Sequence, residues 1–340
     1  GASKRTHPPP RRKHDVCSTR RPMTLREWLP TAAEVAADLA HVPELPAEYD
    51  AWTAPWRGYE LHFYSLERVR FFNGFAWSRA SARAWHLPLG AVAAYALMIP
   101  LLRRVRRRVE LRAFAQCWNF GLALFSAMGF CACAPVLLTE LYRNGFYFTC
   151  CAPAPWYGGG VCGLFVALFI YSKFAELAPP RRPDEARAFF AARSRAQVDT
   201  ALILLAKRRL IFLHWWHHAT VLLYCWHSYG TQIATGLWFA TMNYFVHALM
   251  YAYYGCMGVE RLRPRVKKRA IFVTLLQLAQ MVVGIGVTVR AVLYQIEGEE
   301  CSVNKTNSIL GLAMYSSYFV LFGIFFVDTY VRSSSKAKRA

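Results

Sequence analysis

The sequence is poor in acidic residues and lacks paired cysteine motifs. Its 340 residues include 20 Asp and Glu against 41 Lys and Arg, a formal net charge of +21 at pH 7. The 10 cysteines form no Cys-x-x-Cys pair and mostly lie in apolar segments, which argues against a thiolate zinc site and against a disulfide framework. No signal-peptide pattern opens the chain, and no recognised nucleic-acid-binding fold accompanies the basic charge. We therefore expect no nucleic-acid partner.

Apolar residues dominate the rest of the composition. Hydrophobic residues make up 55% of the chain and aromatic residues 15%, and such a chain with a strong basic excess is typical of a multi-span membrane protein. Seven apolar segments approach the roughly 20 residues that a helix needs to cross a bilayer. We predict an all-α, polytopic fold with seven transmembrane helices at about 85–102, 114–138, 160–177, 210–229, 235–256, 270–293 and 308–331.

The loops between these segments differ strongly in positive charge. The loops after the first, third and fifth segments, together with the tail, hold 25 Lys and Arg, whereas the alternate loops hold 2. Because basic loops stay in the cytosol, this bias predicts a cytosolic tail at 332–340 and a lumenal N-terminal region at 1–84. The first part of that region is rich in Pro and Arg and is expected to be disordered. The membrane domain would span 85–331.

Two features of the predicted lumenal loops agree with this topology. Asn304 begins an Asn-Lys-Thr sequon, which predicts a glycosylation site. Cys150, Cys151 and Cys301 also fall on the predicted lumenal side. An oxidising compartment there permits a disulfide between Cys301 and either Cys150 or Cys151.

Three histidines stand in the apolar run LIFLHWWHHATVLLYCW at 210–226. His214, His217 and His218 have i, i+3, i+4 spacing and therefore share one face of a helix. Imidazoles are costly in a bilayer unless they have a function, so the cluster predicts a ligand set or a reaction centre. With the predicted topology the histidines lie roughly 6–12 Å from the cytosolic end of their helix.

The following segments carry polar faces at similar depth. His247 lies roughly 13 Å from the cytosolic end of the fifth helix, with Asn243 one turn before it and Tyr251 one turn after it. In the sixth segment Gln277 and Gln280 belong to a polar stripe, for which interhelical packing and contact with the site both stay open. We expect the two histidine sets to meet inside a helical bundle.

Two kinds of chemistry use such histidines. Membrane di-iron desaturases and hydroxylases carry HxxHH clusters but need about eight histidines, and only four of the ten here share the required depth. Acid–base or nucleophilic work by imidazole needs no metal and fits four histidines. A seven-span receptor or transporter would leave the cluster unexplained. We favour metal-free chemistry without a cofactor.

Four motifs, in order, resemble the ELO family of very-long-chain fatty acid elongases. They are a split KxxExxDT box followed by FLHWWHH, MNYFVHALMYAYY and TLLQLAQ. The box begins with Lys173 and Glu176 and ends with Asp199, and removing residues 178–197 would restore KFAELVDT. That stretch is either a cytosolic insert or sequence retained from an intron.

The resemblance implies a seven-span enzyme of the endoplasmic reticulum that encloses an acyl tunnel. It would condense malonyl-CoA with a long-chain fatty acyl-CoA and release CO2, CoA and a 3-ketoacyl-CoA. His217 or His218 would meet the thioester, either as an acyl-imidazole or by polarising carbonyls and moving protons. His247 and Asn243 would orient the thioester. Membrane lipids and other elongation-cycle enzymes are the expected partners.

Further residues are expected to support this chemistry. Support for the site would come from Tyr251, Lys173, Glu176, Asp199, Gln277 and Gln280. Basic residues at the cytosolic mouth could bind CoA phosphates or act as positive-inside anchors. These are Lys207, Arg208, Arg209, Lys267 and Lys268.

Overall fold

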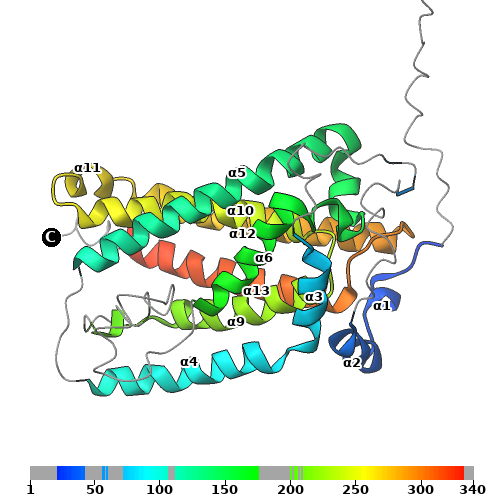
Figure 1. Ribbon diagram of the computed structural model, residues 1–340, viewed down its shortest axis with the longest axis horizontal. Coiled ribbons are helices and arrows are strands. Elements are labelled where there is room, and N and C mark those ends of the chain that lie inside the picture. Colours follow the sequence, from blue (N-terminus) through cyan, green and yellow to red (C-terminus); the bar gives the residue numbers. More distant parts are fainter. Residues whose placement is uncertain are drawn as a thin grey trace, which may run out of the picture.

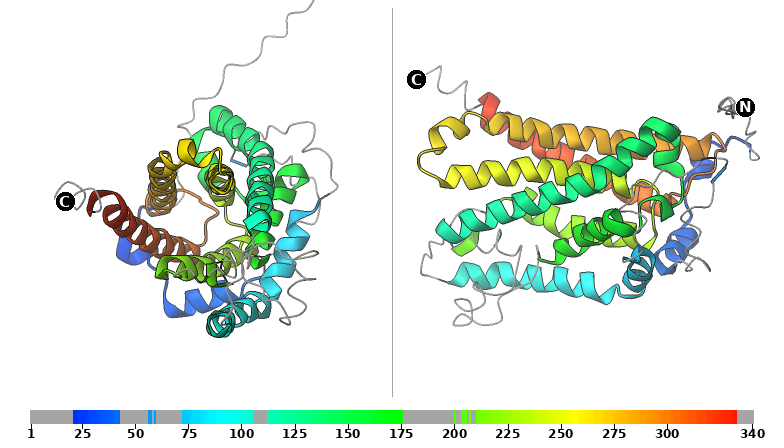
Figure 2. Two further views of the ribbon diagram at one scale, coloured as in Figure 1. Left: turned by 90° about the vertical axis from the view of Figure 1, so that its left-hand side faces the viewer. Right: turned by 45° about the horizontal axis from the view of Figure 1, so that its top comes forward.

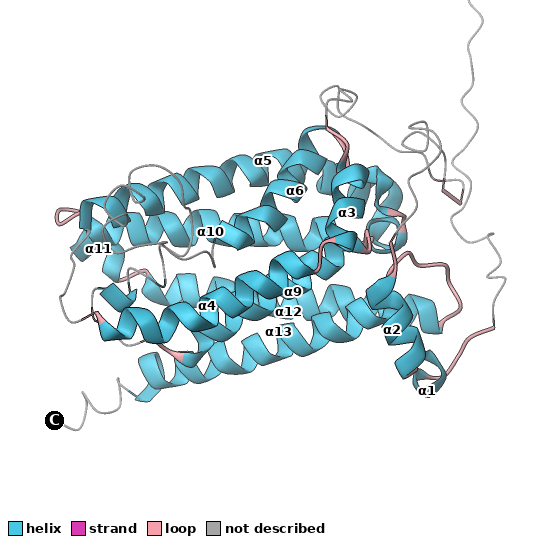
Figure 3. Ribbon diagram, turned by 60° about the horizontal axis from the view of Figure 1, so that its bottom comes forward, coloured by secondary structure: helices cyan, strands magenta, loops and turns pink. Residues whose placement is uncertain are grey.

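A computed structural model describes residues 21–42, 56–57, 59, 72–105, 112–175, 200, 203–205, 207 and 210–332. Within these ranges the regular elements are helices, without a strand, and pairing between extended residues is limited to isolated bridges. Figure 3 shows this helical content. The all-α prediction is confirmed for the described part of the chain.

A helix occupies each of the seven apolar segments. They are α4 (His86–Arg104), α5 (Arg112–Cys151), α6 (Gly160–Ala175), α9 (Phe212–Gly230), α10 (Gly236–Gly258), α12 (Ala270–Ile296) and α13 (Lys305–Phe326), the last extended by the π-helical turn η3 (Val327–Arg332). The largest difference from expectation is in α5, which continues past residue 138. It changes direction at Gly145, whose φ of 82° is accessible because glycine has no Cβ. The stretch expected as a loop therefore stays helical.

Four helical stretches are long and apolar enough to cross a membrane. They are His86–Arg104, Ala113–Cys151, Ala270–Ile296 and Lys305–Arg332. The protein is therefore a multi-pass membrane protein. The helices α9 and α10 have comparable length, but histidine, threonine and asparagine side chains interrupt their apolar surface.

Six of the described helices pack side by side in a closed ring. Along it α9 contacts α13, α13 contacts α12, α12 contacts α10, α10 contacts α5, α5 contacts α6, and α6 contacts α9. Figure 2 shows the ring end-on in its left view, and α4 packs against α9 from outside. Figure 1 shows α11 (Arg263–Lys267) and the end of α13 at one end of the bundle, and α1 (Leu25–Trp28) and α2 (Ala32–Ala40) at the other.

The most extensive contact in the ring joins α5 and α10. Tyr244 of α10 lies against Gly129 of α5, where an added Cβ would sit 2.3 Å from the tyrosine ring. Its hydroxyl donates to the carbonyl oxygen of Phe165 in α6 at 2.8 Å. One buried aromatic side chain thereby holds three helices together, and glycine is required where its ring approaches the backbone.

The N-terminal helices dock onto the connection between α12 and α13. Each begins with a capping box. Trp28 is buried and donates its indole N–H to Gln295 Oε1 at 2.8 Å, and the Thr306 hydroxyl donates to Asp38 Oδ2 at 2.6 Å. A further helix, α3 (Gly74–Arg83), packs against α6 and α9. Ordered structure therefore begins well before the expected start of the membrane domain at residue 85.

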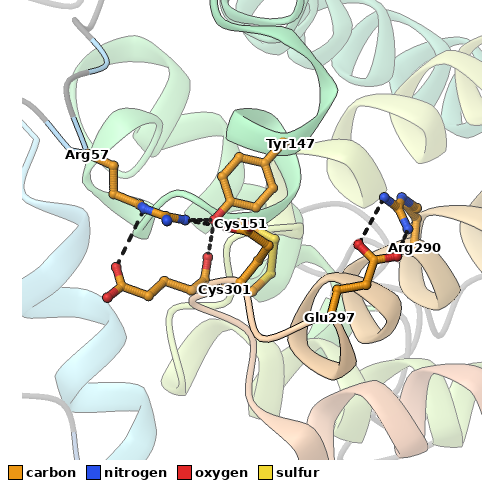
Figure 4. A network of polar contacts seen from close by, with 8 residues as sticks. Arg57, Tyr147, Cys151, Arg290, Glu297 and Cys301 are labelled. Atoms are coloured by element: carbon orange, nitrogen blue, oxygen red, sulfur yellow. Dashed lines mark hydrogen bonds and ion pairs between the residues drawn. A yellow bond between two sulfur atoms is a disulfide. The ribbon is translucent and has the colours of Figure 1, made fainter. Parts of the chain in front are cut away.

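A disulfide and an arginine fasten the end of α5 to the same connection (Figure 4). Cys151 pairs with Cys301, and Cys150 is a buried free thiol, so the structure selects one of the two pairings left open by the sequence. Arg57 donates to Glu299 Oε2 at 2.9 Å and to the hydroxyl of Tyr147. The bundle end away from α11 is therefore cross-linked by covalent and ionic contacts.

Candidate functional site

The HxxHH histidines lie in the first two turns of α9. The ring centroids of His214 and His218 are 4.5 Å apart, and those of His217 and His218 are 5.2 Å apart. His218 is buried with 7% of its surface exposed, whereas His214 and His217 are half-buried. The predicted helical spacing thus brings three imidazoles together, with His218 in the middle.

Helix α13 holds the backbone beside His217. The Tyr318 hydroxyl donates to the His217 carbonyl oxygen at 3.1 Å and shares a hydrogen bond of 2.6 Å with the hydroxyl of Thr220. The rings of His217 and Tyr318 have centroids 5.0 Å apart. His217 therefore lies on the side of α9 that faces α13.

His214 is held from another direction. Its Nε2 is 2.8 Å from the Thr200 hydroxyl oxygen, which is 3.1 Å from the Tyr95 hydroxyl of α4. Thr200 is the final residue of the split KxxExxDT box. The end of that box therefore reaches the histidine cluster in this chain, although residues 178–197 precede it.

The predicted polar face of α10 forms a second group. Asn243 Nδ2 lies 3.3 Å from His247 Nε2, and the rings of His247 and Tyr251 have centroids 5.4 Å apart. The Gln277 side chain of α12 contacts Met250 Sδ of α10 at 3.2 Å, and Gln280 is buried. The Gln277 contact is the interhelical packing considered as one alternative. The site role of these residues stays a prediction.

The basic candidates separate into one buried and several exposed side chains. Lys173 is buried near the end of α6, with Nζ 4.5 Å from the centroid of the Phe169 ring. Lys207 donates to the carbonyl oxygen of Val105, just after α4. Lys267 and Lys268 are exposed at the end of α11. The exposed lysines lie at the end of the bundle where α4 ends and α9 begins (Figure 1).

Several predicted residues lie outside the described part of the chain. They are Glu176, Asp199, Arg208, Arg209 and the stretch 178–197. Among the residues that are described, no group of three His, Cys, Asp or Glu side chains has an arrangement that could hold a metal ion.

The sequon lies at the opposite end of the bundle. Asn304 is the N-cap of α13, with Oδ1 accepting from the Asn307 N–H at 2.9 Å, and Thr306 is buried. Glycosylation at Asn304 stays a prediction.

Sequence reasoning missed three side chains around the histidines. Tyr95, Thr200 and Tyr318 come from α4, from the box, and from α13. Thr200 could have been found, since it completes the VDT half of the box. Tyr95 and Tyr318 sit in ordinary apolar helices, where tyrosine carries no signal of a site.

Comparison with known proteins links this site to a family. Residues 81–179 and 186–338 match the ELO family, described as GNS1/SUR4, with the break inside the atypical stretch. "Very long chain fatty acid elongase 6" of Drosophila melanogaster is 38% identical over 236 residues, 69% of this chain and 68% of its own length. "Putative fatty acid elongase 3" of Caenorhabditis elegans is 34% identical over 285 residues, 80% and 82%. "Very long chain fatty acid elongase 6" of Gallus gallus is 37% identical over 238 residues, 70% and 81%.

Proposed function

This chain belongs to the ELO (GNS1/SUR4) family and is a fatty acid elongase of the 3-ketoacyl-CoA synthase type, and we propose that the histidines of α9 perform its condensation. The observation that carries this proposal is the contact of three imidazole rings in the first turns of α9. Neighbouring imidazoles can accept and return protons near neutral pH without a metal.

The closed ring of six helices is the basis for proposing a tunnel for the acyl chain. We propose that the seven helices α4, α5, α6, α9, α10, α12 and α13 all span the membrane and that the acyl chain lies inside the ring of six. Exposed lysines and arginines of α11 lie at the end of the bundle from which α9 starts, which favours a cytosolic position for that end. The protein would then reside in the endoplasmic reticulum with its C-terminus in the cytosol.

His217 is the best candidate to meet the acyl thioester. It is half-buried and faces α13, while His218 is enclosed between its two neighbours. In the covalent route an imidazole nitrogen of His217 attacks the acyl carbonyl carbon, and the carbon–sulfur bond breaks. The sulfur leaves as CoA thiol after taking the imidazole proton, which His218 can relay.

The second half-reaction consumes malonyl-CoA. Loss of CO2 leaves an enolate, whose carbon attacks the acyl carbon and breaks the carbon–nitrogen bond to His217. The ring nitrogen of His217 takes one proton from water, relayed by His218, and the neutral imidazole is restored. The product is a 3-ketoacyl-CoA with two more carbons in its chain. His247, paired with Asn243, would orient the thioester and stabilise developing negative charge on its oxygen. In the direct route the same enolate attacks the acyl-CoA, and the histidines only polarise carbonyls and move protons.

The CoA moieties of both substrates would lie at the basic end of the bundle. Lys207, Lys267 and Lys268 lie there, and Arg208 and Arg209 follow Lys207 in sequence. Their phosphate contacts would place the thioesters at the first turns of α9. Other enzymes of the elongation cycle would receive the product from this face.

The decisive test uses microsomes that express the full chain, with labelled malonyl-CoA and acyl-CoA primers of graded length. We expect labelled 3-ketoacyl-CoA from the native chain and a loss of at least about a hundredfold for His217→Ala. Ser317→Ala, which changes a hydroxyl on α13 that bonds Trp216 Nε1 at 3.2 Å, serves as the control. Undiminished product from His217→Ala would refute the catalytic assignment.

Mass spectrometry separates the two routes. Incubation with acyl-CoA alone should leave an acyl group on His217 if the covalent route operates. Absence of the adduct in active enzyme would favour direct condensation. Deleting residues 178–197 and repeating the assay tests whether that stretch limits activity.

A further inference from the structure

A buried hydroxyl pair reaches the histidine cluster from outside the helical ring. Thr200 Oγ1 lies 3.1 Å from the Tyr95 hydroxyl and 2.8 Å from His214 Nε2. Tyr95 has 1% of its surface exposed and Thr200 0%. These three side chains come from α4, from the end of the split box and from α9, so only the folded chain brings them together.

The hydroxyl of threonine suits this position chemically. It carries one donor and two acceptor sites, so it can donate to a neutral imidazole nitrogen and accept from a protonated one. Its hydrogen bond to His214 therefore survives a change in the charge of the ring. Because Thr200 is buried between them, removing its hydroxyl would take a hydrogen-bond partner from both His214 and Tyr95, which makes the arrangement specific.

We propose that Thr200, held in turn by Tyr95, is a positioning residue that fixes the imidazole of His214 beside His218. The proposal rests on the proposed function of the α9 histidines. Thr200 acts on the reaction through His214 alone: it stops rotation of the ring, whose centroid lies 4.5 Å from that of His218. The order of contacts is then Tyr95, Thr200, His214, His218 and His217, from the outer helix α4 to the thioester.

The test compares variants of the full chain in the microsomal elongation assay. Thr200→Val should lower kcat about tenfold to a hundredfold, while KM for acyl-CoA stays within about twofold. Thr200→Ser keeps the hydroxyl and should recover kcat to within about threefold. Tyr95→Phe should lower kcat by a smaller factor, about threefold, because it loosens Thr200 without removing it. Thr288→Val is the matched control, since its buried hydroxyl donates to the Gly284 carbonyl oxygen at 2.9 Å.

A double-mutant cycle with His214→Gln isolates the coupling. If Thr200 acts through His214, adding Thr200→Val to the His214→Gln variant should lower kcat by less than about a further twofold. Full additivity, or equal loss in Thr200→Ser and Thr200→Val, would overturn the positioning role. If Thr200→Val fails to fold, wild-type kcat in Tyr95→Phe would overturn it equally. Full activity of His214→Gln would instead count against the proposed function of the cluster.

Discussion

Replacing Asn307 with leucine removes the amide that joins α13 to α9 at the bundle end away from the HxxHH cluster. The Asn307 side chain is buried with 1% exposed. Its Nδ2 lies 2.9 Å from His227 Nδ1 and donates to Ser228 Oγ at 2.8 Å, and its Oδ1 accepts from the Tyr224 hydroxyl at 3.2 Å. Three polar groups of α9 therefore depend on one amide, whose size leucine closely matches.

Two estimates bracket the loss of stability expected for Asn307→Leu. Three hydrogen bonds at the average of about 0.6 kcal/mol between membrane helices amount to about 2 kcal/mol. Leaving buried partners unsatisfied costs about 1–3 kcal/mol each. The other ring nitrogen of His227, Nε2, is already buried without a hydrogen bond. Losing Asn307 would therefore leave the His227 ring without the side-chain partner that Nδ1 has in the native chain. We expect Asn307→Leu to lower the free energy of unfolding by about 3 kcal/mol, which corresponds to a fall in Tm of about 6 °C.

Heating the detergent-solubilised protein and measuring the folded fraction by size-exclusion chromatography gives Tm. Ser308→Ala is the matched control, because its buried hydroxyl donates to the Asn304 carbonyl oxygen within its own chain segment at 3.3 Å. Its Tm should fall by less than about 2 °C. If both variants unfold at the same temperature, the inter-helix network does not stabilise the bundle as argued. The kcat of folded Asn307→Leu should be unchanged, because the site lies at the other end of α9.

Three further predictions concern other parts of the molecule. Cys151→Ala should lower stability by about 2–4 kcal/mol, because the bridge joins positions 150 residues apart, while Cys150→Ser should not; equal losses in thermal unfolding would contradict this. Lys267→Ala with Lys268→Ala should raise KM for malonyl-CoA about threefold at low salt and less at high salt, and an unchanged KM would indicate anchoring alone. The hydrogen bond from the Thr31 backbone N–H holds the pKa of Glu34 below its usual value. The stabilisation of α2 by the Glu34 carboxylate is therefore present above the unfolded pKa and lost as pH falls through the lower folded value. We therefore expect amide exchange in α2, measured relative to neighbouring helices, to become faster as the pH falls. This increase should be larger in the native chain than in Glu34→Gln.

Much of the fold could be predicted from local pattern. Apolar runs located α4, α6, α9, α10, α12 and α13 to within a few residues, because helix formation in an apolar segment depends on that segment alone. The extension of α5 was missed because a charged and polar stretch beyond residue 138 reads as a loop. Glycine at 145 allows the chain to bend there and continue as a helix.

Part of the candidate site could likewise be predicted from local pattern, and part could not. The i, i+3, i+4 spacing was enough to predict contact among His214, His217 and His218, since helix geometry fixes it. The hydroxyls of Tyr95 and Tyr318 could not be assigned, because each sits in an apolar helix, and its partner is set by how distant helices pack.

The sequence by itself determined the helical class, the membrane character, the family motifs and the clustering of the α9 histidines. All of these follow from composition and from periodicity within single segments. Only the tertiary structure decided which cysteine of the adjacent pair bonds Cys301, which side chains hold His214 and His217, and that helices near the N-terminus dock beside α12 and α13. The physical reason is that most of these contacts join residues about a hundred or more positions apart, and their geometry exists only once the helices have packed. Thr200 and His214 are only 14 positions apart, but Tyr95, which lies 105 positions before Thr200, completes their arrangement.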